Sequence, residues 1–211
     1  MKRTLVPSRK GERGRTDRAA LDELLDDVLV GYMGLSLDEG PLVIPVSFAR
    51  QGDRILFHGS TGSRRMRTVA EGAQICFTVT AIDALKISRS LEGTGLAYRS
   101  AVLFGNCTLL EGAEKSQALN DYVDRYVPGR TGEVRGSTAK EEAATMVLAL
   151  AIDQWSMKVS PNPPQDGDED LLGDAWAGML PLRTGYTEAV AAPDVRPGIA
   201  VPASVERLLA R

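Results

Sequence analysis

Residues 30–59 read VGYMGLSLDEGPLVIPVSFARQGDRILFHG, and this stretch decides the fold class. It holds three apolar, β-prone runs, each of a length that suits one strand. The runs are 30–36, 41–50 and 54–59. They are linked by DEG at 38–40 and QGD at 51–53, which have the residues of tight turns, so the pattern predicts an antiparallel meander. Pro45 lies inside the second run, which places that run at an edge or a bulge because proline cannot donate a ladder hydrogen bond.

The flanking sequence extends this pattern on both sides. A helix is predicted over 18–28, capped by Thr16 or Asp17, and a shorter one from Ser63 to about Glu71. Further strands are predicted at 74–80, 86–90, 96–111 and 146–160, and further helices at 113–126 and 137–145. Many short strands with few helices favour a closed antiparallel barrel. The regular β-α alternation of a Rossmann-type fold is missing.

The composition is that of an ordinary globular protein. The chain has 211 residues, 43% of them hydrophobic, and a net charge of −3, so nothing favours nucleic acid or an anionic membrane as a partner. No apolar run approaches the ~20 residues of a membrane span. Cys76 and Cys107 lie in apolar runs and are predicted to be free thiols, which suits a reducing cytoplasm. Since His58 is the only histidine, a zinc site is disfavoured.

The two ends of the chain differ in composition from the predicted barrel, which occupies 16–160. Residues 1–15 are basic and have no apolar stretch, which predicts either a flexible tail or an arm that contacts phosphate. Residues 161–211 are rich in Pro, Gly and Ala, and are predicted to form an extension that packs on the barrel or on a partner subunit. Within it, Trp176 has to cover an apolar surface, either of the partner or of a ligand ring.

A strand, a turn and a helix meet at residues 57–65, which read FHGSTGSRR. Small residues in such a turn let backbone amides approach an anion, and the helix N-terminus adds partial positive charge. The guanidinium groups of Arg64 and Arg65 match the geometry of phosphate oxygens. The segment therefore predicts a phosphate site, and the alternative is a capped surface helix with solvated arginines.

Two further residues are candidates for cofactor contact. His58 ends a strand beside the phosphate site, where it would donate a hydrogen bond or relay a proton, since its ordinary pKa lies near neutrality. The alternative for His58 is a packed core residue. Arg99 interrupts an apolar strand, so it needs a phosphate or a carboxylate as partner if it is buried, unless it lies in solvent at an edge.

These motifs, in this order, resemble those of the pyridoxamine 5′-phosphate oxidase-like FMN-binding split-barrel family, and within it the nitroimidazole-resistance (Nim) type. The resemblance spans about residues 16–160. It rests on GYMG at 31–34, VIPVSF at 43–48, LFHG at 56–59, YRS at 98–100 with FG at 104–105, and IDQWS at 152–156.

The resemblance implies a mainly β fold with peripheral helices, a six-stranded antiparallel split β-barrel, and a homodimer with FMN between the subunits. Ser63 and Arg65 would hold the phosphate, assisted by Arg64. The other cofactor contacts would come from Pro45, Val46, Ser47, Phe57, His58, Gly59, Arg99, Ser100 and Trp176. Of these, His58 is the candidate catalytic residue.

The expected function is that of an FMN-dependent oxidoreductase, in which the cofactor carries the redox chemistry. It would take hydride from NAD(P)H or another donor and reduce a small organic substrate, such as a nitroaromatic. Nothing matches the substrate-binding Arg and His set of true pyridoxamine phosphate oxidases. The alternative is a non-catalytic protein that binds flavin, deazaflavin or haem, with His58 as the only histidine available to a haem iron.

Overall fold

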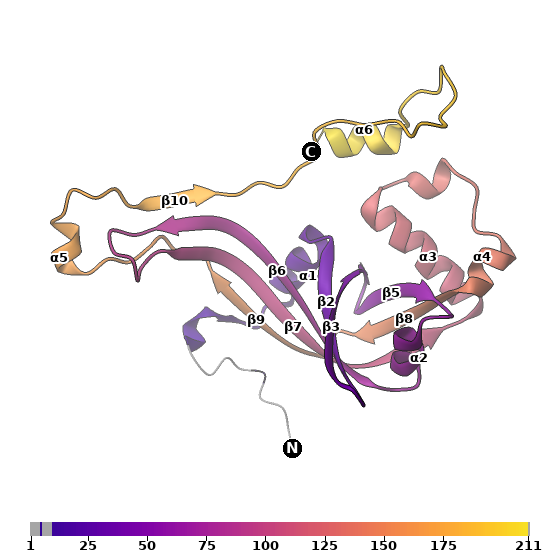
Figure 1. Ribbon diagram of the computed structural model, residues 1–211, viewed down its shortest axis with the longest axis horizontal. Helices are drawn as coiled ribbons and strands as arrows, with labels where there is room; N and C mark the ends of the chain where they lie inside the picture. The colour runs from indigo at the N-terminus through magenta and orange to yellow at the C-terminus, as the bar shows by residue number, and fades with distance from the viewer. Residues whose placement is uncertain (1–4, 6–9, 211) are drawn as a thin grey trace.

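The computed structural model describes residue 5 and residues 10–210, and it is built mainly of antiparallel strands (Figure 1). The strands are β1 (Gly14–Arg15), β2 (Val30–Leu37), β3 (Gly40–Ser47), β4 (Ala49–Gln51), β5 (Arg54–Ser60), β6 (Gln74–Ile87), β7 (Gly95–Leu110), β8 (Thr145–Ala151), β9 (Gln154–Ser160) and β10 (Gly178–Pro181). The helices are α1 (Arg18–Asp27), α2 (Arg64–Ala70), α3 (Gly112–Tyr126), α4 (Ala139–Ala144), α5 (Asp168–Leu171) and α6 (Ala203–Leu209), with 3₁₀ turns η1 (Gly11–Arg13) and η2 (Arg130–Gly132).

The sheet has the strand order β3-β2-β6-β7-β8-β5-β4, and every pairing in it is antiparallel. Strand β7 changes partner along one of its edges: residues 98–104 pair with β9, and residues 107–110 pair with β8. Gly105 lies at this change, and a Cβ there would come within 2.9 Å of the Leu150 side chain. The sheet therefore divides at Gly105, which confirms the predicted split-barrel fold.

The barrel interior is held by aromatic side chains from three different strand regions. Phe48, Phe57 and Phe77 are fully buried, and the Phe77 ring meets each of the other two edge-on at centroid distances of 5.0 and 5.1 Å. Gly31 makes room for this arrangement, because a Cβ at that position would overlap the Phe77 ring. A second, smaller apolar cluster lies between α3 and the outer side of β5 and β8, and it contains Leu56.

Three predicted strand boundaries are wrong, and each has a local cause. The predicted strands 74–80 and 86–90 form one strand, β6, which accommodates its irregularity by a register shift between Ile82 and Ala84. The predicted strand 146–160 is a hairpin of β8 and β9 that turns at 152–153. The predicted strand 41–50 breaks at Phe48, because the Tyr126 hydroxyl accepts from the Phe48 N–H at 2.8 Å and lies 2.9 Å from its carbonyl.

The basic N-terminal segment lies against the barrel where the structure describes it. Gly14 and Arg15 form β1, which pairs with Lys158 and Met157 of β9. The expected flexible tail thus does not extend to these residues, whereas most of the segment before Lys10 lies outside the described residues.

The C-terminal extension leaves the barrel and returns to it (Figure 1). The Asp166 carboxylate accepts from the Arg89 side chain at 2.8 Å and fixes the start of the extension at the tip of the β6–β7 hairpin. Strand β10 then pairs with β6. The chain from Leu182 to Val201 is exposed throughout, and α6 docks through Ser204, which donates to Glu133. Among the described residues, no helix is both long and apolar enough to cross a membrane.

Tyr126 connects α3 to the barrel wall, since its hydroxyl also lies 2.7 Å from the Leu29 carbonyl. The substitution Tyr126→Phe leaves these backbone groups without their partner and is expected to lower the free energy of unfolding by about 1–3 kcal/mol in urea denaturation. Tyr186→Phe is the control, because Tyr186 is exposed and should change that free energy by less than ~0.5 kcal/mol. Equal effects of the two substitutions would contradict this role of Tyr126.

Candidate functional site

The turn between β5 and α2 forms one side of a cavity of about 540 Å³, here called the Arg65 cavity. Ser63 caps α2, because its hydroxyl accepts from the Met66 N–H at 3.4 Å, and Ser60 accepts from the Gly62 N–H at 3.1 Å. These side-chain bonds hold the turn in shape. The cavity is lined by Met33, Ile44, Pro45, Val46, Phe57, His58, Gly59, Ser60, Ser63, Arg65 and Met66.

The three arginines of α2 have different surroundings. Arg64 forms two hydrogen bonds with the Glu39 carboxylate, at 2.7 and 3.2 Å, and does not line the cavity. Arg67 donates to the backbone carbonyls of Thr61 and Gly62. Arg65 lines the cavity, and none of the ion pairs among the described residues involves it. Arg65 is therefore the guanidinium that is available to an anion in this cavity.

The opposite side of the Arg65 cavity is apolar. Strand β3 contributes Ile44, Pro45 and Val46, and β2 contributes Met33. A cavity with apolar walls and a cationic group at one end suits a flat, aromatic ligand that carries a phosphate.

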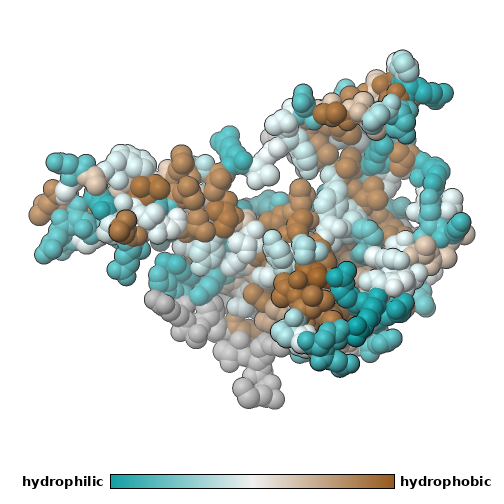
Figure 2. All heavy atoms as spheres, in the orientation of Figure 1, coloured by the Kyte–Doolittle hydropathy of each residue, from teal (hydrophilic) through white to brown (hydrophobic). Residues whose placement is uncertain are grey.

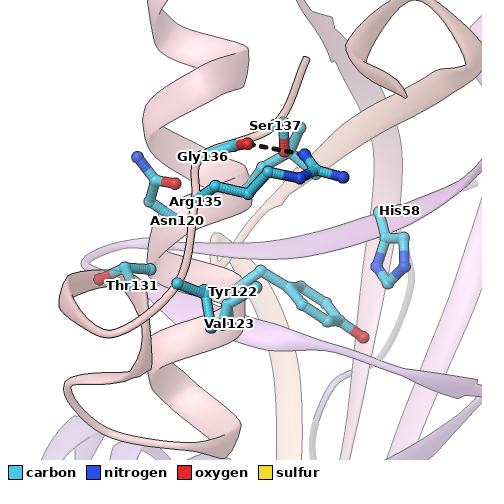
Figure 3. A pocket seen from close by; sticks show the side chains of 10 residues that line it. His58, Asn120, Tyr122, Val123, Thr131, Arg135, Gly136 and Ser137 are labelled. Carbon is cyan, nitrogen blue, oxygen red and sulfur yellow. Dashed lines mark hydrogen bonds between the residues drawn. The ribbon is translucent and has the colours of Figure 1, made fainter. Parts of the chain in front are cut away.

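His58 also lines a second cavity, of about 240 Å³, on the side of α3; we call it the Tyr122 cavity (Figure 3). The imidazole meets the Tyr122 ring edge-on, with the ring centroids 4.3 Å apart and the planes at 80°. This contact fixes the orientation of the imidazole. The cavity is lined by His58, Leu119, Asn120, Tyr122, Val123, Thr131, Val134, Arg135, Gly136 and Ser137.

The protein around these rings favours their neutral forms. Burial lowers the pKa of His58, so its imidazole is neutral at neutral pH and can act as a ligand or acceptor. Burial is also the main cause that raises the pKa of Tyr122, whose hydroxyl is buried and forms no hydrogen bond of ordinary geometry. Figure 3 shows the Arg135 side chain extending across the cavity toward the His58 side, and Arg135 also donates to Gly136 and Glu141.

Most of the predicted cofactor residues come together, and five do not. The Arg65 cavity gathers Pro45, Val46, Phe57, His58, Gly59, Ser63 and Arg65. Neither cavity is lined by Ser47, Arg64, Arg99, Ser100 or Trp176 in the single chain.

Arg99 is engaged by carboxylates instead of a cofactor phosphate. Its guanidinium donates to Asp83 at 3.0 Å and to Asp27 at 2.8 Å, and these bonds raise its pKa. The cluster joins α1 to strands β6 and β7. The sequence left a phosphate and a carboxylate open as the partner of a buried Arg99, and in the structure the partners are the carboxylates of Asp27 and Asp83.

Trp176 lies on the exposed extension, where 67% of its surface is accessible. Its indole packs over Gly178, where a Cβ would come within 2.7 Å of the ring. It lines neither the Arg65 cavity nor the Tyr122 cavity.

The Tyr122 cavity could not be found from the sequence pattern. Leu119, Tyr122 and Val123 have the spacing of a core-facing helix side, and this spacing does not distinguish a packed core from a cavity wall. Met33 and Met66 of the Arg65 cavity were missed for the same reason, as ordinary apolar residues.

Comparison with known proteins identifies structures of high similarity. The FAD and heme binding protein from Mycobacterium smegmatis is 43% identical, with a TM-score of 0.91, over 93% of this chain and 97% of that chain. The flavocytochrome Anf3 from Azotobacter vinelandii is 32% identical, with a TM-score of 0.89, over 96% and 94% of the two chains. A search of the curated proteins gives no match.

The expected similarity to nitroimidazole-resistance proteins is found at the level of the fold. A candidate 5-nitroimidazole antibiotic resistance protein from Bacteroides thetaiotaomicron is 19% identical, with a TM-score of 0.59, over 69% of this chain and 86% of that chain. In sequence, residues 17–159 match the family described as pyridoxamine 5′-phosphate oxidase. The matched segment is nearly the predicted barrel, 16–160, and the chain therefore belongs to the pyridoxamine 5′-phosphate oxidase-like family.

Proposed function

We propose that this protein binds a flavin in the Arg65 cavity and a haem in the Tyr122 cavity, and that it serves electron transfer between them. The observation that carries the proposal is the position of His58, the only histidine of the chain, on the wall of both cavities. The two similar structures support it, since one is described as binding FAD and heme and the other as a flavocytochrome.

The residues of the Arg65 cavity fit a flavin. Its apolar sides, formed by Ile44, Val46 and Phe57, suit a planar ring, and Ser63 and Arg65 supply a hydroxyl and a guanidinium for phosphate. Both FMN and FAD carry a phosphate on the chain attached to the ring. The similar FAD-binding structure makes FAD our choice, in place of the FMN expected from the sequence.

The residues of the Tyr122 cavity fit a haem. Leu119, Val123 and Val134 provide apolar walls, and Arg135 brings a guanidinium to the wall that is already paired with Glu141. His58 would supply a neutral imidazole to the haem iron, since burial lowers its pKa below the ordinary value.

When bound, the two groups supply the redox chemistry, and the protein determines their separation and surroundings. His58 would ligate the haem through its imidazole, and the same residue also lines the cavity proposed for the flavin. Tyr122 holds the imidazole orientation through its edge-on contact. The barrel core behind Phe57 is fully buried, whereas His58 itself is exposed in the single chain.

Reduction of a small organic substrate with NAD(P)H stays a prediction. Only a fold similarity at 19% identity bears on the nitroaromatic substrate. Deazaflavin is a less favoured occupant of the Arg65 cavity, because one of the two similar structures described above is an FAD and heme binding protein and the other is a flavocytochrome.

We also propose that the chain forms a homodimer through the outer face of β2 and β3. Val30, Tyr32 and Val43 expose 47%, 47% and 65% of their surface on neighbouring positions of this strand pair. Figure 2 shows apolar side chains gathered over this region. Contiguous exposed apolar residues of this kind mark association surfaces. Sedimentation velocity tests the dimer, and a monomer at micromolar concentration would contradict it.

His58→Ala is expected to abolish the haem absorption band after reconstitution, because the chain has no other imidazole. Addition of free imidazole should restore the band, because it refills the space of the lost side chain. Tyr122→Phe is the control, since it keeps the ring that contacts His58. Haem binding by His58→Ala without imidazole, at wild-type affinity, would refute the assignment.

Arg65→Ala is expected to weaken flavin binding by about tenfold or more, because a charge-assisted hydrogen bond contributes ~1.5–3 kcal/mol. Fluorescence titration with FMN and FAD measures this loss. Arg64→Ala provides a matched control in the same helix, and its affinity should stay within about twofold, since Arg64 pairs with Glu39. Equal losses of affinity in the two variants would contradict the proposal that Arg65 binds the flavin phosphate.

A further inference from the structure

Lys86 of β6 is a buried cation whose hydrogen-bond partner is neutral. Lys86 exposes only 8% of its surface, and its ammonium donates to the Ser160 hydroxyl at 3.0 Å. Ser160 is itself only 3% exposed. An ammonium group has three donors and a full positive charge, so a hydroxyl satisfies one donor and leaves the charge uncompensated.

The charged groups near Lys86 are cations as well. Burial lowers the pKa of Lys86, and the charges of Arg13 and Lys10 lower it further. The pairing of β1 with β9 holds this segment in place, beside the strand that carries Ser160 (Figure 1). The one carboxylate of this segment is Glu12, which is exposed and takes part in none of the ion pairs among the described residues.

A buried ammonium with two further cations near it is unfavourable unless an anion joins them. The hairpin is open beside the start of the Lys86 side chain, because Gly95 pairs directly with Lys86 and no heavy atom lies within 4 Å of the place of a Cβ there. We propose that Lys86, Arg13 and Lys10 form a binding site for a phosphate-bearing anion, distinct from both cavities of the proposed function.

Phosphate suits this site better than a carboxylate does. A terminal phosphate carries ~1.5–2 negative charges near neutral pH and has three acceptor oxygens, whereas a carboxylate, like a phosphate inside a dinucleotide, carries one charge and two free oxygens. Arg13 offers a guanidinium fork, and the two lysines offer point charges. None of the three residues lines the Arg65 cavity or the Tyr122 cavity.

The test is calorimetric titration of inorganic phosphate into flavin-free protein at constant ionic strength. It uses the Arg65→Ala background, so that the phosphate contact proposed for the flavin does not contribute. Lys86→Met is expected to weaken phosphate binding by about tenfold or more. Lys140→Met is the control, since Lys140 is an exposed cation on α4, and its affinity should stay unchanged.

Lys86→Met should fold, because replacing an uncompensated buried charge by an apolar side chain of similar length is neutral or stabilising. Circular dichroism checks this point, and Arg13→Gln provides a second variant, at a less buried position, with the same expected direction. No measurable phosphate binding in the parent protein, or equal binding by parent and Lys86→Met, would overturn the proposal.

Two sources of the phosphate are distinguished by the flavins themselves. If the second phosphate of a bound dinucleotide occupies the site, Lys86→Met weakens FAD binding and leaves FMN binding unchanged in the otherwise wild-type chain. If both flavins bind as before while inorganic phosphate binding is lost, the site takes a separate phosphate-bearing molecule. Because the calorimetric test needs no flavin or haem, its failure is distinct from a failure of the proposed function.

Discussion

Two consecutive side chains of β5 determine the functional region, because neighbouring residues of a strand point to opposite faces. Phe57 is fully buried in the barrel core against Phe77, and this contact fixes the register of the strand. His58 must then face outward, toward α3, where Tyr122 meets it. A shift of one residue would bury the imidazole and expose the phenylalanine. The packing of the core is therefore what places the only histidine between two cavities.

The elements around β5 complete this arrangement. At the end of the strand, the turn and the cap of α2 bring Arg65 to the first cavity, while Glu39 holds Arg64 away from it. On the other side, Tyr126 attaches α3 to the barrel wall at Phe48, and α3 in turn carries Tyr122. Helix α3 therefore serves both stability and the proposed function, since it packs on the small apolar cluster and also forms a wall of the Tyr122 cavity.

The sequence predicted correctly those features that are formed by residues close together along the chain. The meander, the capped helix after Gly62 and the Gly- and Ser-rich turn before that helix are all local features, and the structure contains them. Arg99 shows the limit, because its partners Asp27 and Asp83 lie 72 and 16 residues away and only the fold brings them together. The Tyr122 cavity and the break at Phe48 depend on α3 contacts in the same way. The choice between flavin alone and flavin with haem also rests on the folded position of His58.

Titration of haem into protein already loaded with FAD tests the central claim most directly, with absorption reporting the haem and fluorescence the flavin. The account predicts that both bind together, in equal amounts per chain, and that haem binding quenches the flavin emission because His58 lies between the two sites. Displacement of FAD by haem would contradict the account, because it would mean that the two groups compete for one cavity. Retention of FAD with no haem bound would contradict it as well.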